Sequence, residues 1–103
     1  MLDGLTLDTF APLVGQTFRL HLDDGTTIDT VLESATKNPA SGWKPADGTT
    51  PRESFTLVFR GPPQFVLPQR IYRFDHETLG NTELFIVPIG RTAQGVSYEA
   101  VFS

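Results

Sequence analysis

The sequence predicts an all-β domain: a small antiparallel six-stranded barrel or strongly bent sheet with a short N-terminal helix. Apolar and polar residues alternate along most of the chain, which is typical of strands with one buried face. Turn residues separate these segments at short intervals. Short links favour antiparallel neighbours, because a parallel crossover needs about a dozen residues or more. Closure into a barrel is favoured because it removes exposed edges.

The only helical pattern lies at residues 6–15. Phe10, Leu13 and Val14 fall on one face of a helix there. Gly15 can adopt the left-handed conformation that commonly ends a helix. We expect one or two helical turns that plug an end of the sheet.

A hairpin follows, with strands at residues 16–22 and 27–34. The Asp-Gly pair within 23–26 is typical of a two-residue turn whose central residues both have positive φ. Apolar residues lose their alternation near Thr30 and Val31, which predicts a bulge at that point.

The same alternation predicts four further strands, at residues 53–60, 69–76, 83–89 and 96–102. Leu84 to Val87 is apolar on both faces, which indicates a strand covered on two sides, and Pro88 ends it or marks a bulge. The strand at 96–102 runs to the chain end, so we expect that its free edge could pair a homodimer.

Residues 35–53 lack periodicity and contain three prolines, so they are interpreted as a long surface loop. No repeat or change in composition divides the chain. We therefore expect a single domain over residues 1–103.

Composition excludes several classes of function. The formal charge of −4 argues against binding nucleic acid through phosphate contacts. No apolar run is long enough for a membrane helix, and the absence of cysteine excludes disulfides and thiol chemistry. The N-terminus lacks the pattern of a signal peptide, so we expect a cytoplasmic protein, with incorporation into an exported particle left open. No pattern of residues indicates a cofactor or a metal.

No catalytic constellation is evident, and we do not expect an enzyme. Asp75 and Glu77 flank His76, but successive residues of a strand point to opposite faces, so both cannot flank its ring. His76 is instead expected to bond the backbone of the turn that follows. Asp23 and Asp24 are interpreted as turn residues.

Two groups of residues are candidates for a binding surface. Trp43 either folds back on the barrel or contacts a partner, and Phe65 belongs to a second apolar stretch that could join it. The other candidates are cationic or titratable side chains that could receive an anionic group at one barrel mouth: Arg60, Arg70, Arg73 and His76.

The second half of the chain contains a set of motifs: Phe55-x-Leu57-x-Phe59-x-Gly61-Pro62, Gln69-x-x-Tyr72, His76-x-x-Leu79-Gly80, Leu84-Phe85-Ile86-Val87-Pro88 and Tyr98-Glu99-Ala100-Val101-Phe102. With these motifs the chain resembles a family of short bacterial proteins of unknown function. The similarity covers about residues 5–103 apart from a longer loop at 37–52, and no catalytic or binding residue is carried over from it. Proteins of this kind are often encoded near phage tail-collar-like proteins, so the resemblance implies an accessory role in a tail-like or surface assembly.

Three functional hypotheses follow. The first is a non-enzymatic protein–protein interaction or assembly module with an unidentified protein partner. The second is a barrel that binds a small anionic ligand at its rim, because a six-stranded barrel fills its interior with side chains. The third is a hydrolase whose nucleophile and base are brought together only by folding.

Overall fold

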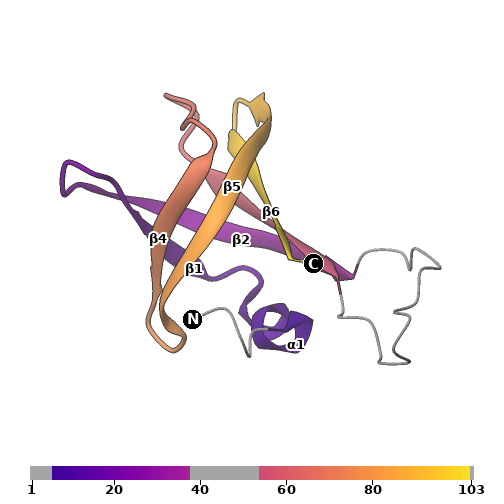
Figure 1. Ribbon diagram of the computed structural model, residues 1–103. Coiled ribbons are helices and arrows are strands. Elements are labelled where there is room, and N and C mark those ends of the chain that lie inside the picture. Colours follow the sequence, from indigo (N-terminus) through magenta and orange to yellow (C-terminus); the bar gives the residue numbers. More distant parts are fainter. Residues whose placement is uncertain (1–5, 38–53, 103) are drawn as a thin grey trace, which may run out of the picture.

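A computed structural model describes residues 6–37 and 54–102 and confirms the predicted fold class. The strands form a closed antiparallel barrel in the order β1-β2-β3-β6-β5-β4 (Figure 1). The chain runs through α1 (Leu7–Phe10), the 3-10 turn η1 (Ala11–Leu13), β1 (Thr17–His21), β2 (Thr27–Lys37), β3 (Phe55–Gly61), β4 (Arg70–His76), β5 (Gly80–Thr92) and β6 (Gly95–Phe102).

The barrel consists of two three-stranded meanders, β1-β2-β3 and β4-β5-β6. Pairing of β3 with β6 and of β1 with β4 closes it. Consecutive strands pair as predicted except β3 and β4, because β3 pairs with β2 on one side and with β6 on the other. The strand β6, expected to offer a free edge for a homodimer, pairs with β3 from Val96 to Phe102 and with β5 from Gly95 to Glu99.

The two long strands, β2 and β5, form the corners of the barrel. Thr27–Val31 of β2 pairs with β1, and the register with β3 begins at Val31 and reaches Lys37. In β5, Gly80–Ile86 pairs with β4 and Val87–Thr92 pairs with β6. Each corner strand therefore changes its pairing partner partway along its length.

A bulge lies at each corner, just beyond the point where the partner changes. One falls between Leu32 and Ser34, and the other between Pro88 and Gly90. The bulge expected at Thr30 and Val31 was placed too early, because the register with β1 is continuous through Val31. The bulge expected at Pro88 is confirmed.

Two strands, β2 and β5, extend three residues or more beyond their predicted bounds. Residues 35–37, assigned to the loop, continue β2 because they pair with Leu57, Thr56 and Phe55 of β3. The fifth strand starts at Gly80 and ends at Thr92, several residues beyond the expected 83–89 at each end. The remaining loop residues, 38–53, lie outside the described part of the chain.

The barrel interior is filled with side chains. Phe59 lies at its centre, with its ring 5.3 Å from that of Phe18 and 4.9 Å from that of Phe74. Phe10 of α1 plugs one end against Phe55 and Phe102, which confirms the expected role of the helix. Any ligand or partner must therefore bind on the outside or at a rim.

The opposite end is covered by the connection between β3 and β4. Leu67 is buried there, and its N–H donates to the Tyr98 hydroxyl oxygen at 2.9 Å. The Tyr72 hydroxyl donates to the carbonyl of Pro68 at 2.8 Å. Two tyrosines from different strands thus fix the proline-rich connection over the barrel end.

The β1–β2 turn differs in detail from the predicted type. Only Gly25 has positive φ, at 87°, so Asp24 does not adopt the conformation that a two-residue turn of the expected type requires. Gly25 N–H donates to the Leu22 carbonyl, and Leu22 N–H donates to that of Thr26. This is a three-residue loop in which glycine supplies the left-handed residue.

At the end of η1, Gly15 has a φ of 90°, the left-handed conformation that the sequence predicts for the end of the helical segment.

Candidate functional site

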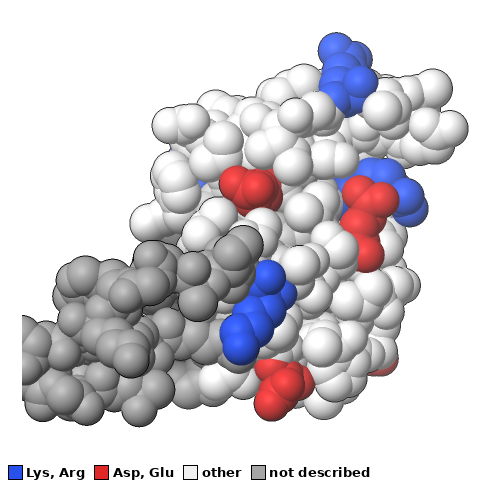
Figure 2. Space-filling view, turned by 90° about the vertical axis from the view of Figure 1, so that its right-hand side faces the viewer, with Lys and Arg blue, Asp and Glu red and all other residues white. Residues whose placement is uncertain are grey.

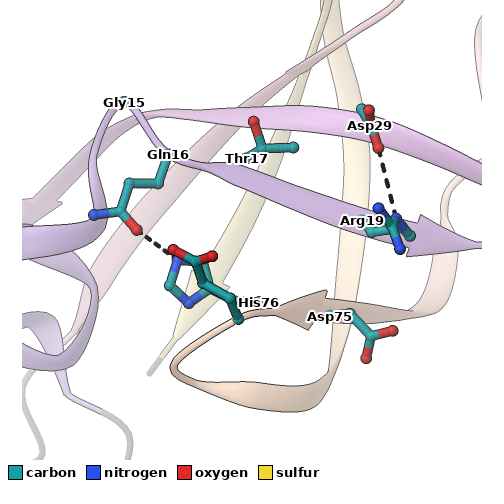
Figure 3. A pocket seen from close by; sticks show the side chains of 8 residues that line it. Gly15, Gln16, Thr17, Arg19, Asp29, Asp75 and His76 are labelled. Carbon is teal, nitrogen blue, oxygen red and sulfur yellow. Dashed lines mark hydrogen bonds and ion pairs between the residues drawn. The ribbon is translucent and has the colours of Figure 1, made fainter.

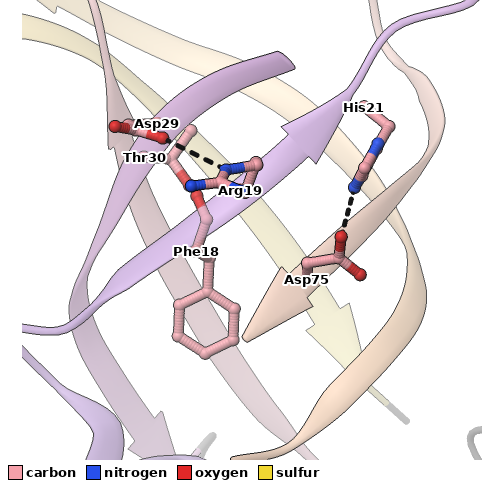
Figure 4. A network of polar contacts seen from close by, with 6 residues as sticks. All are labelled: Phe18, Arg19, His21, Asp29, Thr30 and Asp75. Atoms are coloured by element: carbon pink, nitrogen blue, oxygen red, sulfur yellow. Dashed lines mark hydrogen bonds and ion pairs between the residues drawn. The ribbon is translucent and has the colours of Figure 1, made fainter. Parts of the chain in front are cut away.

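A polar network joins β1 to β4 on the outside of the barrel (Figure 4). His21 Nε2 lies 2.5 Å from Asp75 Oδ2, and Arg73 Nη2 lies 3.2 Å from His21 Nδ1. A guanidinium only donates hydrogen bonds, so Nδ1 of His21 accepts from Arg73. Nε2 then carries the ring hydrogen and donates a hydrogen bond to Asp75. Both nitrogens of His21 are therefore engaged.

His76 points inward at the end of β4 and organises the following turn. Its Nδ1 accepts from the N–H groups of Thr78 and Leu79, each at 3.1 Å. Nε2 consequently carries the hydrogen and donates to Gln16 Oε1 at 2.6 Å. The ring also packs 4.7 Å from that of Phe18. This confirms the expectation that His76 bonds turn backbone.

A pocket of about 560 Å³ lies on the outer wall where the pairing of β1 with β4 stops (Figure 3). Its charged lining consists of Arg19, Asp29, Asp75 and Glu77. Arg19 lies 3.8 Å from Asp29. With three carboxylates and one guanidinium, the lining has the wrong sign for an anionic ligand. Within the described residues, no group of three or more His, Cys, Asp or Glu side chains could hold a metal ion.

The three arginines expected at one mouth do not come together. Arg60 on β3 contacts Glu33 at 3.2 Å, whereas Arg70 on β4 contacts Asp23 at 2.6 Å. In the strand order, β3 and β4 are three places apart and lie on opposite sides of the barrel. Arg73 lies on β4 but is bonded to His21. Each guanidinium already has a local partner, so the predicted anion-binding mouth is not assembled.

Charges of both signs are dispersed over the face drawn in Figure 2. Basic and acidic side chains lie among uncharged ones, and neither sign forms a large patch there. Such a face offers no cationic track for a phosphate backbone.

Two titratable groups outside the pocket have shifted pKa values. The Thr26 hydroxyl and N–H donate to Asp24 Oδ1 at 2.6 and 3.0 Å and hold the pKa of that carboxyl below its usual value. Burial raises the pKa of the Tyr72 hydroxyl, opposed in part by Arg70, whose guanidinium lies 5.4 Å from the ring centre. Both shifts reflect turn and barrel-end structure and do not mark a reactive centre.

An apolar pair is exposed on the outer face of the second meander. Ile71 and Phe85 are direct cross-strand partners on β4 and β5, and they are 59% and 52% exposed. Ile89 on β5 and Val101 on β6 are also more than half exposed. Phe65, proposed from the sequence, is 41% exposed in the β3–β4 connection beside Val66. Trp43 lies outside the described residues.

Phe85 was not among the predicted surface residues, because the run from Leu84 to Val87 predicts a strand that is covered on both faces. Leu84 and Ile86 are buried, but Phe85 between them faces outward. A signal was available in the chain itself. Strands covered on both faces need helices on the second side, and the single short helical segment predicted was already assigned to a barrel end.

Comparison with known families places residues 5–102 within the family described as Domain of unknown function (DUF6916). The chain belongs to this family. No curated protein and no solved structure matches it.

The region matched to DUF6916 includes both meanders and the helical segment that plugs the barrel. The family description carries no activity and no functional residue. Among the described residues of this DUF6916 domain, no helix is of a length and apolarity that would let it cross a membrane.

Proposed function

We propose that this chain is a non-enzymatic protein–protein interaction module, and that its contact surface is the outer face of β4 and β5 around Ile71 and Phe85. The observation that carries the proposal is the adjacency of these two exposed side chains. Opposed residues in an antiparallel pair have Cβ atoms about 4.5–5.5 Å apart, so the two side chains form one continuous apolar patch.

Single exposed hydrophobic residues are common on soluble proteins and need no special explanation. Gathered apolar side chains rimmed by polar ones are instead typical of contact surfaces. Arg73 and Glu83 border the pair on one side, and Val87 continues it on the other. Aromatic residues such as Phe85 are enriched at the centres of interfaces, where charged residues are depleted.

Two observations favour an interaction module over a hydrolase. His21 has both ring nitrogens occupied by Asp75 and Arg73, and His76 has both occupied by the turn and Gln16. A general base needs a free nitrogen within reach of the proton that it removes. Neither imidazole meets that requirement in this arrangement.

The resemblance of the second half of the chain to a family of short bacterial proteins, often encoded near phage tail-collar-like proteins, extends the proposal. In that extension, the module is an accessory or assembly component of a phage-tail-like system, made in the cytoplasm and able to enter an exported particle. The motif residues of β5 include Phe85 itself, so the segment that carries the resemblance also carries the contact surface.

The test is a quantitative pull-down from native host extract with three baits: wild type, Phe85→Lys and the control Val14→Lys. Val14 is 43% exposed and precedes β1, outside the second meander. We expect wild type and the control to recover the same protein. Phe85→Lys should recover at least about tenfold less, since loss of an aromatic anchor costs 2 kcal/mol or more and tenfold corresponds to about 1.4 kcal/mol.

Equal recovery by all three baits would contradict the proposed surface. Recovery of no specific protein by wild type would contradict the interaction module as a whole.

A further inference from the structure

We propose that residues Gly80–Ile86 of β5 receive an extended segment of the partner protein as an added β-strand. This inference rests on the proposed function and specifies how its surface is used. The partner segment would pair by backbone hydrogen bonds along the edge of β5. Its outward side chains would lie beside Phe85, as in other complexes formed by strand addition.

The first support is the incomplete pairing of β5. Gly80–Ile86 is paired with β4 on one side, and pairing with β6 begins only at Val87. In the described residues, this stretch therefore has a strand neighbour on one side alone. A strand edge without a partner presents N–H and C=O groups that can template another strand.

The second support is the path of β6. Its last residues, Ala100–Phe102, pair with Leu57, Thr56 and Phe55 of β3 and have no register with β5. Figure 1 shows β5 and β6 diverging toward the lower part of the view. Pairing of β6 with β5 is thus absent beside the half of β5 that carries Phe85.

The third support is that this edge lacks most of the devices that usually protect one. Natural edges are blunted by charged side chains, especially lysine, and by proline, bulges or a covering helix. Gly80–Ile86 contains neither lysine nor proline and has one charged side chain, Glu83, and the β5 bulge lies beyond it, between Pro88 and Gly90. The corner strand β2 differs, because it has a bulge after Leu32, ends in Lys37 and packs against α1 and η1.

The charged side chains beside Gly80–Ile86 indicate the chemistry of the partner segment. Glu83 lies two residues before Phe85 on the outer face, and Glu99 is opposite Val87. Within the described residues neither carboxylate makes an ion pair, and Arg73, the register partner of Glu83, bonds His21 instead. An added strand with alternating apolar side chains and at least one Lys or Arg would complement this surface.

The test uses a displayed library of random linear peptides, selected on the immobilised full chain. We expect enrichment of peptides that alternate apolar residues with Lys or Arg. Binding of the enriched peptides should fall at least about tenfold with Phe85→Lys and with Glu83→Lys, and should be unchanged with Val14→Lys. Methylation of alternate backbone amides of the peptide should abolish binding, because it removes the donors that pair with β5.

Several results would overturn strand addition. These are absence of enrichment, peptides insensitive to backbone methylation, or peptides unaffected by both β5 variants. A wild-type homodimer that Phe85→Lys dissociates would also overturn it, because a second copy of the chain would then occupy the edge of β5.

The two proposals fail separately. If the pull-down depends on Phe85 while selected peptides are insensitive to methylation, the interaction surface stands and strand addition is wrong. If peptides bind as expected while the host extract yields no partner, the edge of β5 can bind an added strand, but the proposed role in the host is wrong.

Discussion

The two meanders of the barrel have the same pairing scheme but different outer faces. The outer face of β1-β2-β3 carries charged pairs such as Arg19 with Asp29 and Arg60 with Glu33. None of the exposed large hydrophobic side chains in the described part of the chain lies on these strands. The second meander exposes four, at Ile71, Phe85, Ile89 and Val101. Barrel closure requires only the inner faces to be apolar, so the outer face of β4 and β5 is free to serve another role.

The β1–β2 and β4–β5 hairpin turns differ in a similar way. The β1–β2 turn is held by Asp24, an exposed side chain that bonds Thr26. The β4–β5 turn is held by His76, which is buried and also contacts Gln16 and Phe18. One turn is therefore fixed locally, whereas the other is fixed to the core. Substitutions at the β4–β5 turn should therefore lower the free energy of unfolding more than substitutions at the β1–β2 turn.

The largest effect is expected for His76→Ala. This change removes the acceptor for two backbone N–H groups, the bond to Gln16 and the packing on Phe18. We expect a loss of about 2–3 kcal/mol in the free energy of unfolding, and a Tm lower by about 10–20 °C for a domain of this size. Urea unfolding and calorimetry measure both quantities.

His21→Ala is the matched control, because it removes the other histidine from a surface network. It should cost about 1 kcal/mol or less. Equal losses for the two variants would contradict the distinction between a turn fixed to the core and a local surface contact.

A smaller effect is expected for Thr30→Val. Thr30 is fully buried on β2, and its hydroxyl donates to the carbonyl of Phe18 at 2.9 Å. Valine keeps the shape but not the donor, so the variant should lose about 1–2 kcal/mol in urea unfolding. Thr27→Val, at an exposed position of the same strand, should stay within about 0.5 kcal/mol of wild type. An unchanged Thr30→Val would show that this bond contributes nothing.

The Asp24 turn should show a weak dependence on acid. Hydrogen bonds from Thr26 lower the pKa of Asp24 in the folded chain relative to the unfolded one. Its stabilising contribution is therefore present above the unfolded pKa and is lost as pH falls through the folded pKa. Asp24→Asn should remove this acid dependence from the amide shifts of residues 24–26 in an NMR titration. Persistence of the dependence in the variant would assign it to another group.

The smallest effect on stability is expected where the effect on binding is greatest. Ile71→Lys and Phe85→Lys replace exposed side chains, so each should change the free energy of unfolding by about 0.5 kcal/mol or less. A loss of several kcal/mol, measured by urea unfolding, would show that the pair supports the fold and would remove the argument that it is kept for a partner.

Much of the barrel could be predicted because a period of two specifies which side chains face the core. Phe55, Leu57 and Phe59 on β3 and the hairpin of β1 with β2 followed directly from that pattern. The strand pair that closes the barrel could not be derived, because the pairing of β1 with β4 joins residues more than fifty positions apart and leaves no local signal. The turn geometry at Asp24 was missed because an Asp-Gly pair is compatible with more than one loop length.

The candidate surface was harder to predict than the fold. His76 was interpreted correctly, since its position at a strand end limits what its ring can reach. His21 and Asp75 meet only through the register of β1 with β4. The arginines were grouped by their nearness in sequence, but the strand order places Arg60 across the barrel from Arg70.

Hydrogen–deuterium exchange of the full chain, alone and with the protein recovered by the wild-type bait, tests the central claim most directly. The claim is that the outer face of β4 and β5 is the contact surface. We predict added protection concentrated in residues 70–73 and 80–87, with residues 17–31 unchanged. Protection confined to β1 and β2, with β4 and β5 exchanging as in the free protein, would contradict the account.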